Sequence, residues 1–214
     1  MKGLTEEPIG RWAINIDIEG FGSLYHKENL VLRVLGDLME GVFRIGSLCF
    51  PATPERLFAH QLGDGFIIVS EFPEQTLDRP IGIALALLKH VAASGRYAKA
   101  TIAEGDFSDI QSCYPSAITN VANSDRSVRI GSGIMTLFPV MGTALIRAVS
   151  VAKVCPSGPM LAVAKTSQHR LPEGLILKDT PFDELLIVDW VHSKNNLADD
   201  ITKKAQLKIL DTPT

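Results

Sequence analysis

Two aspartates that lie close to glycines are the residues of this 214-residue sequence best suited to phosphate chemistry. Asp17 precedes Gly20 and Gly22, and Asp64 has a glycine on each side. Carboxylate oxygens suit Mg²⁺, which keeps oxygen ligands and shares them with substrate phosphates. Glycines remove Cβ bulk, so backbone N–H groups can approach phosphate oxygens closely. If the two carboxylates meet in space, they could hold divalent ions that activate one oxygen and stabilise a leaving one.

The elements around the two aspartates decide whether they can meet. The apolar, β-branched run 11–18 predicts a buried strand with Asp17 near its end, and residues 56–62 predict a second strand that ends just before Asp64. An amphipathic helix over 23–43 separates the two strands. If this crossover made them parallel neighbours, their carboxyl ends would share one edge of the sheet and the two aspartates would face one space. The alternative is a structural role for each aspartate as a cap or turn residue.

The rest of the sequence completes an alternation of strands and helices. After a tight glycine turn we expect strands and helices at 66–70 (strand), 79–93 (helix), 97–103 (strand), 139–152 (helix), 160–163 (strand), 185–190 (strand) and 197–210 (helix). The order βααββαβ predicts an α+β fold with a ferredoxin-like core, a mixed and mainly antiparallel sheet, and helices on one face. We expect a single domain over 1–214, with its core at about 11–165 and a C-terminal strand and helix extension at 166–214.

Composition limits the classes of partner. The net charge is −3, which disfavours nucleic-acid binding because contacts to a phosphate backbone need clustered Lys and Arg. No apolar run approaches the roughly 20 residues that span a bilayer, and the first eight residues do not resemble a signal peptide. The three cysteines are widely spaced and predict reduced thiols. We therefore expect a cytoplasmic protein without a membrane span.

Two segments resemble the metal motifs of class III nucleotidyl cyclases, the catalytic domain of adenylate and guanylate cyclases. Asp17-Ile18-Glu19-Gly20-Phe21-Gly22-Ser23-Leu24 is similar to the first motif, and Leu62-Gly63-Asp64-Gly65-Phe66 is similar to the second. Residues 100–105 resemble the strand that follows in the family, and residues 142–153 resemble the helix after it. The resemblance covers roughly residues 11–165.

The resemblance implies a two-metal mechanism that uses Mg²⁺ or Mn²⁺. Asp17, Asp64 and the backbone carbonyl of Ile18 would bind the ions, and Gly20 and Phe21 would contact a triphosphate. The 3′-hydroxyl of a nucleoside triphosphate would attack its own α-phosphate and release pyrophosphate. In the family two chains pair head to tail, so we expect a homodimer with sites at the interface. The nucleotide-binding residues that we infer in this segment are Ile18, Glu19, Gly20, Phe21 and Gly22.

The sequence departs from the family pattern at three positions. Ile146 stands where the family has an Asn that orients the ribose, Ser150 where it has an Arg that stabilises the transition state, and His60 where it has a purine-selecting Lys. Lys99, Arg129 and Arg147 are the candidates to replace the missing cation, with a solvated surface charge as the alternative for each. Phe58 alternates with His60 and would line either the base pocket or the core.

Two explanations fit these departures. The chain could be an inactive cyclase homologue that acts as a nucleotide-binding or protein-interaction module. It could instead be a divergent active cyclase, because the Gly142-x-Ala-Leu-x-x-Ala pattern resembles bacterial pyrimidine-nucleotide cyclases of phage-defence signalling. In that case the product would be a cyclic cytidylate or uridylate in antiviral signalling. A diguanylate cyclase is disfavoured, since Leu62 and Gly65 replace two positions of its turn motif.

Overall fold

A computed structural model describes residues 10–24, 28–52, 55–70, 72–122, 127–138 and 140–210. Its strands are β1 (Arg11–Ile18), β2 (Leu57–Leu62), β3 (Gly65–Ser70), β4 (Ala98–Gly105), β5 (Ser108–Asp109), β6 (Ser127–Ile130), β7 (Gly133–Thr136), β8 (Val140–Met141), β9 (Leu161–Ala164), β10 (Leu177–Lys178) and β11 (Leu185–Val188). Its α-helices are α1 (Phe21–Leu24), α2 (Glu28–Arg44), α3 (Asp78–Ala92), α4 (Ser116–Thr119), α5 (Thr143–Val154) and α6 (Asn196–Lys204), with a π-helical turn η2 (Ile45–Cys49) and 3₁₀ turns η3 (Gln111–Cys113) and η4 (Lys165–Arg170).

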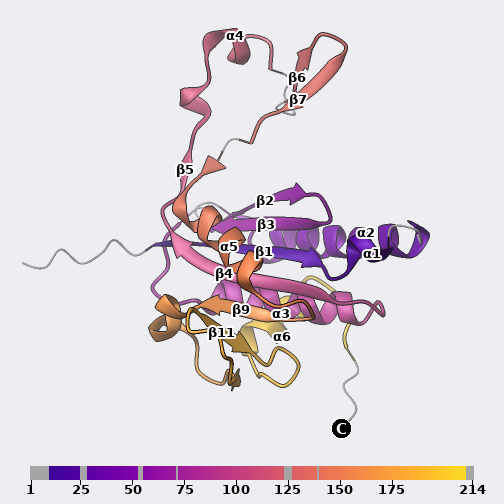
Figure 1. Ribbon diagram of the computed structural model, residues 1–214, viewed down its shortest axis with the longest axis vertical. Helices are drawn as coiled ribbons and strands as arrows, with labels where there is room; N and C mark the ends of the chain where they lie inside the picture. Colours follow the sequence, from indigo (N-terminus) through magenta and orange to yellow (C-terminus); the bar gives the residue numbers. More distant parts are fainter. Residues whose placement is uncertain are drawn as a thin grey trace, which may run out of the picture.

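One seven-stranded sheet organises the chain, in the order β10-β11-β9-β4-β1-β3-β2 (Figure 1). Only the pair β4–β9 is parallel; the other pairs in this sheet are antiparallel. The predicted α+β fold with a mixed, mainly antiparallel sheet is confirmed. Strands β9 to β11, from the C-terminal part of the chain, continue the same sheet.

The expected pairing of the first two strands as parallel neighbours is wrong. Strand β1 lies between β3 and β4 and is antiparallel to both, while β2 is the outermost strand and contacts only β3. Strands β1 and β2 therefore run in the same direction with β3 between them. The physical reason is the tight hairpin after β2, whose returning strand takes the place beside β1.

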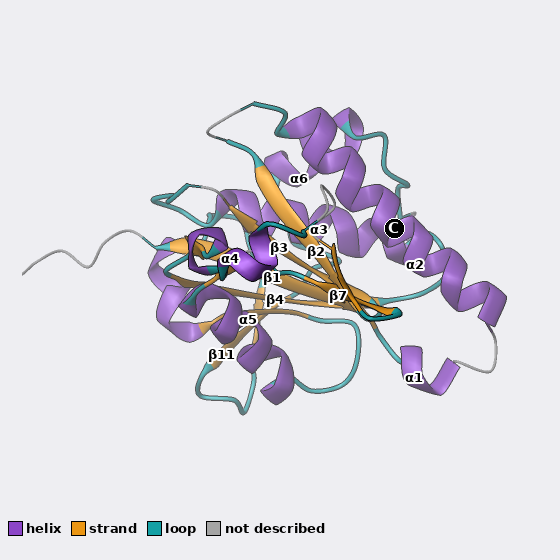
Figure 2. Ribbon diagram, turned by 90° about the horizontal axis from the view of Figure 1, so that it is seen from above, coloured by secondary structure: helices purple, strands orange, loops and turns teal. Residues whose placement is uncertain are grey.

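Alternation along β1 divides the interior into two layers. Trp12, Ile14 and Ile16 point into the larger core, which packs under α2, α3 and α6. Ala13 points to the opposite face, where α5 packs. Helices thus cover both faces of the sheet (Figure 2). The sequence predicts helices on one face only, whereas α5 packs on the face opposite α2, α3 and α6. Small side chains at this contact, including Ala144 and Ala148 of α5, allow the helix to lie close against the strands.

Residues 105–122, 127–138 and 140–141 form an arm that projects away from the sheet (Figure 1). Strands β5 and β8 pair at its base, and β6 and β7 form a separate hairpin farther out. The helix predicted from 139 begins only at Thr143, and residue 139 itself lies outside the described residues. The residue before the helix is Gly142. Only glycine fits there, because a Cβ would lie 2.1 Å from the carbonyl oxygen of Asp106 on the other leg of the arm.

The C-terminal helix is shorter than its predicted span of 197–210. The side chain of Asn195 caps α6 by accepting the backbone N–H of Ala198 at 2.8 Å, and the helix ends at Lys204. The chain then turns back, and the backbone N–H of Lys208 donates to Nδ1 of the buried His90 at 2.8 Å. Among the described residues, no helix is long and apolar enough to cross a membrane.

Candidate functional site

The end of β1 meets the β2–β3 turn at one edge of the sheet. Asp17 lies directly opposite Gly65 in the β1–β3 register. The backbone N–H of Ile18 donates to the carbonyl oxygen of Asp64 at 3.3 Å. The structure therefore brings Asp17 and Asp64 together, as predicted, although through β3 and not through direct pairing of β1 with β2.

Gly65 permits this close approach. A Cβ at Gly65 would lie 2.2 Å from the carbonyl oxygen of Ile16 and 2.8 Å from the Cα of Asp17. No side chain fits there without displacing the end of β1. Gly65 is thus required for the packing of β3 against β1, in addition to its place in the turn after Asp64.

Burial and neighbouring charge perturb Asp17. Burial raises the pKa of its carboxyl above the ordinary value, Lys99 opposes the shift, and the carboxylates of Asp64 and Glu19 add to it. Its Oδ1 is buried and has no hydrogen-bond partner among the described residues. An acidic oxygen in this state is stabilised by a cation placed against it.

An ion pair flanks the two aspartates. Lys99 lies opposite Asp17 in the β1–β4 register, and its Nζ is 3.6 Å from Oε2 of Glu19. The Lys99 and Glu19 side chains are mostly buried, with 14% and 22% of their surface exposed. The backbone N–H of Glu19 donates to the carbonyl oxygen of Tyr97 at 3.0 Å. Lys99 is thus the positive charge that the fold holds beside the carboxylates.

The residues after β1 form a turn that leads into α1. Gly20 has a φ of 74°, a left-handed conformation that favours glycine, and α1 begins directly after it. Phe21 is half-buried against the larger core, whereas Gly20 and Gly22 are exposed. A Cβ at Gly22 would meet no atom within 4 Å. The glycines leave room for a ligand beside the backbone, in keeping with the predicted triphosphate contacts.

The donor set fits a hard cation that shares its ligands with substrate. Within the described part of the chain no group of three or more His, Cys, Asp or Glu side chains is arranged to hold a metal. Asp17 and Asp64 supply carboxylate oxygens only, and the unsatisfied Oδ1 of Asp17 is suited to a cation. Mg²⁺ is commonly bound by one or two carboxylates together with phosphate oxygens and water. Binding by these aspartates and by the Ile18 carbonyl stays a prediction.

Arg147 lies at the opposite end of the sheet from the aspartates. Its Nη1 donates to the carbonyl oxygen of Glu104 at 3.0 Å. Glu104 is five residues beyond Lys99 on β4, which is about 17 Å at the rise of a strand. Arg147 borders a cavity of about 650 Å³ together with Thr143, His169 and Arg170. The structure does not bring Arg147 and Asp17 together within one chain.

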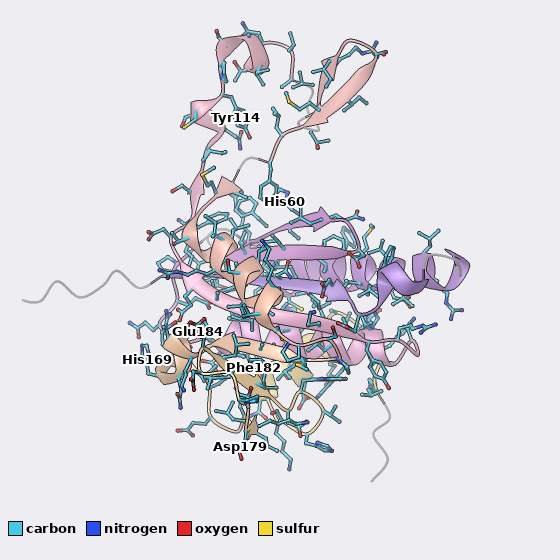
Figure 3. The ribbon with its side chains drawn as sticks, in the orientation of Figure 1. His60, Tyr114, His169, Asp179, Phe182 and Glu184 are labelled. Carbon is cyan, nitrogen blue, oxygen red and sulfur yellow. The ribbon has the colours of Figure 1, made fainter. Side chains whose placement is uncertain are left out.

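The β2 candidates Phe58 and His60 lie on the same sheet face as Asp17. Both pack against the base of the arm, where Figure 3 labels His60. The His60 ring meets the Phe138 ring edge-on, with centroids 4.2 Å apart. The Phe58 ring stacks on Phe107 at 6.4 Å. Arg129 is exposed on β6, in the arm. Phe58 and His60 therefore have packing roles. Among the described residues, no contact joins Arg129 to Asp17 or Asp64.

The two family positions on α5 are both exposed. Ile146 is 62% exposed, and the Ser150 hydroxyl donates to the Ile146 carbonyl at 2.8 Å. Ser150 lies on the exposed side of α5 near Arg147, one helical turn away.

Comparison with known proteins supports the fold. The sequence matches no protein-family model, and no curated protein matches it significantly. Two solved structures of bacterial light-regulated adenylyl cyclases are similar, with TM-scores of 0.51 and 0.50 at 13% and 12% sequence identity. They cover 92% and 94% of this chain, whereas the chain spans only 56% and 59% of theirs. The chain therefore shares its fold with these two adenylyl cyclases.

Proposed function

We propose that this protein is a nucleotidyl cyclase that converts a nucleoside triphosphate to a 3′,5′-cyclic nucleotide and pyrophosphate. The observation that carries the proposal is the meeting of Asp17 and Asp64 at one sheet edge, with a buried Asp17 oxygen that lacks a partner among the described residues. The fold shared with the two adenylyl cyclases supports the same reading.

The reaction joins two ends of one substrate. The 3′-oxygen forms a bond to the α-phosphorus, the bond from that phosphorus to the bridging oxygen breaks, and the 3′-hydroxyl proton leaves to solvent. Mg²⁺ or Mn²⁺, when bound, would supply positive charge to the triphosphate and lower the barrier to attack. Asp17 and Asp64 hold that charge in place. The exposed backbone of Gly20 and Gly22 positions the phosphates, and Lys99 adds charge beside them.

We also propose that the active form is a head-to-tail homodimer. Arg147 is about 17 Å along β4 from the carboxylates of its own chain, so it can serve a nucleotide only across an interface. The arm exposes Val121, Ile130 and Ile134, at 57%, 56% and 71%. Large apolar side chains exposed together on a projecting segment favour contact with a second copy.

We propose a pyrimidine base for the substrate and a role in antiviral signalling. The support is the replacement of the family's purine-selecting Lys by His60, together with the α5 pattern from Gly142 to Ala148. Cytidine and uridine triphosphates are accordingly the substrates that we expect to be consumed.

Four nucleotides test the reaction. ATP, GTP, CTP and UTP are each incubated with Mg²⁺ or Mn²⁺, and the products are identified by mass. We expect a cyclic nucleotide and pyrophosphate in equal amounts, and loss of both in Asp17→Asn and Asp64→Asn. A complete panel without cyclic product would reject the proposal.

A mixing experiment tests the composite site. Asp17→Asn and Arg147→Ala are each inactive alone if both residues are required. Mixed in equal amounts, they form heterodimers in half of the dimers, each with one intact site, so about a quarter of wild-type activity returns. No recovery, with heterodimers shown by native mass spectrometry, would contradict a site shared between chains.

A nucleotide-binding or interaction module is the second candidate. The exposed Ile146 and Ser150, in place of the family's Asn and Arg, favour it. Saturable nucleotide binding that requires Asp17 and yields no pyrophosphate would select this function over catalysis.

A further inference from the structure

Helix α2 keeps a row of apolar side chains on its outer face. Leu32, Met39 and Phe43 are 60%, 43% and 70% exposed, and the exposed Gly36 lies between them in sequence. These four positions, which we call the outer row, are separated by four, three and four residues and therefore share one side of the helix. Leu38, on the opposite side, is fully buried in the larger core. The helix thus presents one apolar face to the core and a second apolar face outward.

The outer row is open to a partner. Figure 2 shows α2 along the periphery of the molecule. A Cβ at Gly36 would meet no atom within 4 Å, so another helix can approach the backbone closely there. Val42 and Phe43 also border an apolar cavity beside η2 and the β2–β3 hairpin, so the apolar surface continues past the helix. Large apolar side chains that gather on one exposed face are typical of an interaction surface.

The outer row is complementary to itself when two copies of α2 lie antiparallel. In a pair centred between residues 37 and 38, Leu32 of each copy lies opposite Phe43 of the other. Met39 of each copy then lies over the open backbone at Gly36 of the other. A two-fold axis forms each of these contacts twice. Bulky side chains therefore meet either apolar side chains or a gap that accommodates them.

Charges beside the outer row match in the same arrangement. Arg33 and Glu40 are both exposed and lie on the same flank of α2, two turns apart. In the antiparallel pair, Arg33 of each copy comes beside Glu40 of the other. Glu40 also pairs with Arg44 of its own helix, and a carboxylate can accept from both cations. A parallel pair lacks this match, because it brings identical residues to the same level.

We propose that α2 is a docking surface for α2 of a second copy of this chain, in antiparallel orientation. This inference goes beyond the proposed function. Helix α2 lies on the sheet face opposite α5, so the contact is distinct from the proposed head-to-tail interface and would join two such dimers. The outer row is about 16 Å long at the rise of a helix. A contact of this length buries little surface, so the association is weak and depends on concentration.

Sedimentation equilibrium of the full chain tests the proposal, from about 1 μM to 1 mM, where weak complexes dissociate. We expect the average mass to rise over this range. Leu32→Glu and Phe43→Glu should each weaken the association at least about tenfold, because each pair would bury two carboxylates in an apolar contact. Leu177→Glu is the matched control, since Leu177 is 42% exposed on β10, at the other edge of the sheet. It should associate as the wild type does, and thermal unfolding shows that each variant is folded.

A charge exchange tests whether the partner surface is α2 itself. Arg33→Glu and Glu40→Arg each place like charges at both flanking contacts, so each variant alone should self-associate about tenfold more weakly. When the two variants are mixed, a pair with one copy of each has opposite charges at both contacts. The mixture should therefore associate with wild-type strength.

The proposal is overturned if the mass of the wild type does not rise, or if Leu32→Glu and Phe43→Glu associate as Leu177→Glu does. A mixture of the two charge variants that associates no better than either alone would refute the antiparallel pairing. Cyclic-nucleotide formation is not among these measurements, so a negative result here leaves the proposed function standing.

Discussion

Gly65→Ala tests whether the close approach of β3 to β1 is what positions Asp17. The added Cβ would lie 2.2 Å from the Ile16 carbonyl oxygen and 2.8 Å from the Asp17 Cα. Both neighbours are backbone atoms, so relief requires the two strands to separate at this register position. Overpacking of this kind typically costs about 1–3 kcal/mol of folding free energy.

The expected effect on function is larger than the effect on stability. Separation of the strands stretches the 3.3 Å bond from the Ile18 N–H to the Asp64 carbonyl, and it moves the two carboxylates apart. A displacement of about 1 Å at a catalytic group commonly lowers turnover by about 100-fold. We therefore expect Gly65→Ala to fold, to lose about 1–3 kcal/mol in urea unfolding, and to lose nearly all cyclic-nucleotide formation.

Gly63→Ala is the matched control in the same turn. Gly63 has a φ of +61°, and a Cβ there meets no atom within 4 Å. The substitution costs about 1–2 kcal/mol through left-handed backbone strain, without displacing β1. Activity should survive in this variant. The reasoning is refuted if Gly65→Ala has wild-type stability, or if Gly63→Ala and Gly65→Ala lose activity to the same extent.

Two further predictions concern stability alone. His90 is buried, its Nδ1 accepts from the Lys208 N–H, and burial lowers its pKa. Since the unfolded chain then binds more protons than the folded protein, the contribution of His90 to stability is complete above about pH 6.5 and falls as the pH drops toward 5. Urea unfolding should show this pH dependence in the wild type and not in His90→Gln. Arg170 pairs with Glu104, and both side chains are nearly buried; the Arg170 Nε also donates to the Gln75 carbonyl at 3.0 Å. Arg170→Met should lower the free energy of unfolding by about 3–5 kcal/mol, because it leaves the buried Glu104 carboxylate unpaired. A loss below about 1 kcal/mol would contradict this expectation.

The sequence predicts the bounds of a strand or helix well where a single local pattern determines them. Strand β1 has the predicted bounds, because its apolar run ends at a glycine turn. Helix α5 begins later than predicted because Gly142 is required by a contact with Asp106, distant in sequence. The arm has no apolar period that would specify it, so its hairpin and its projection from the sheet could not be predicted from local pattern.

The candidate site was predicted only in part for the same reason. The meeting of Asp17 and Asp64 follows from two strands running in one direction, which remains true even though β3 lies between them. The remoteness of Arg147 depends on which end of β4 leads into the arm and on which face α5 packs. Neither is encoded by a motif, since both depend on contacts between distant segments.

Asp17→Asn tests whether Asp17 is a cation-binding residue or an ordinary residue at the end of a strand. The carboxylate is partly desolvated, it faces Asp64 and Glu19, and its Oδ1 has no partner among the described residues. Because burial raises its pKa, the folded protein binds more protons than the unfolded chain near that pKa. In metal-free protein, this group's contribution to stability is therefore greatest at acidic pH and is lost as the pH rises through the folded-state pKa. Asparagine removes the charge, so we expect the metal-free variant to be more stable at pH 7 by about 1 kcal/mol.

Added Mg²⁺ or Mn²⁺ should reverse this order, since a cation that binds only the folded protein stabilises it in proportion to ligand excess. The wild type should gain thermal stability with the metal, and Asp17→Asn should gain less. Equal stability of the two proteins without metal, and equal shifts with it, would mean that Asp17 is an ordinary strand-end residue. A residue that lowers the stability of the empty fold and raises that of the loaded one is expected at a binding centre and has no use as a cap.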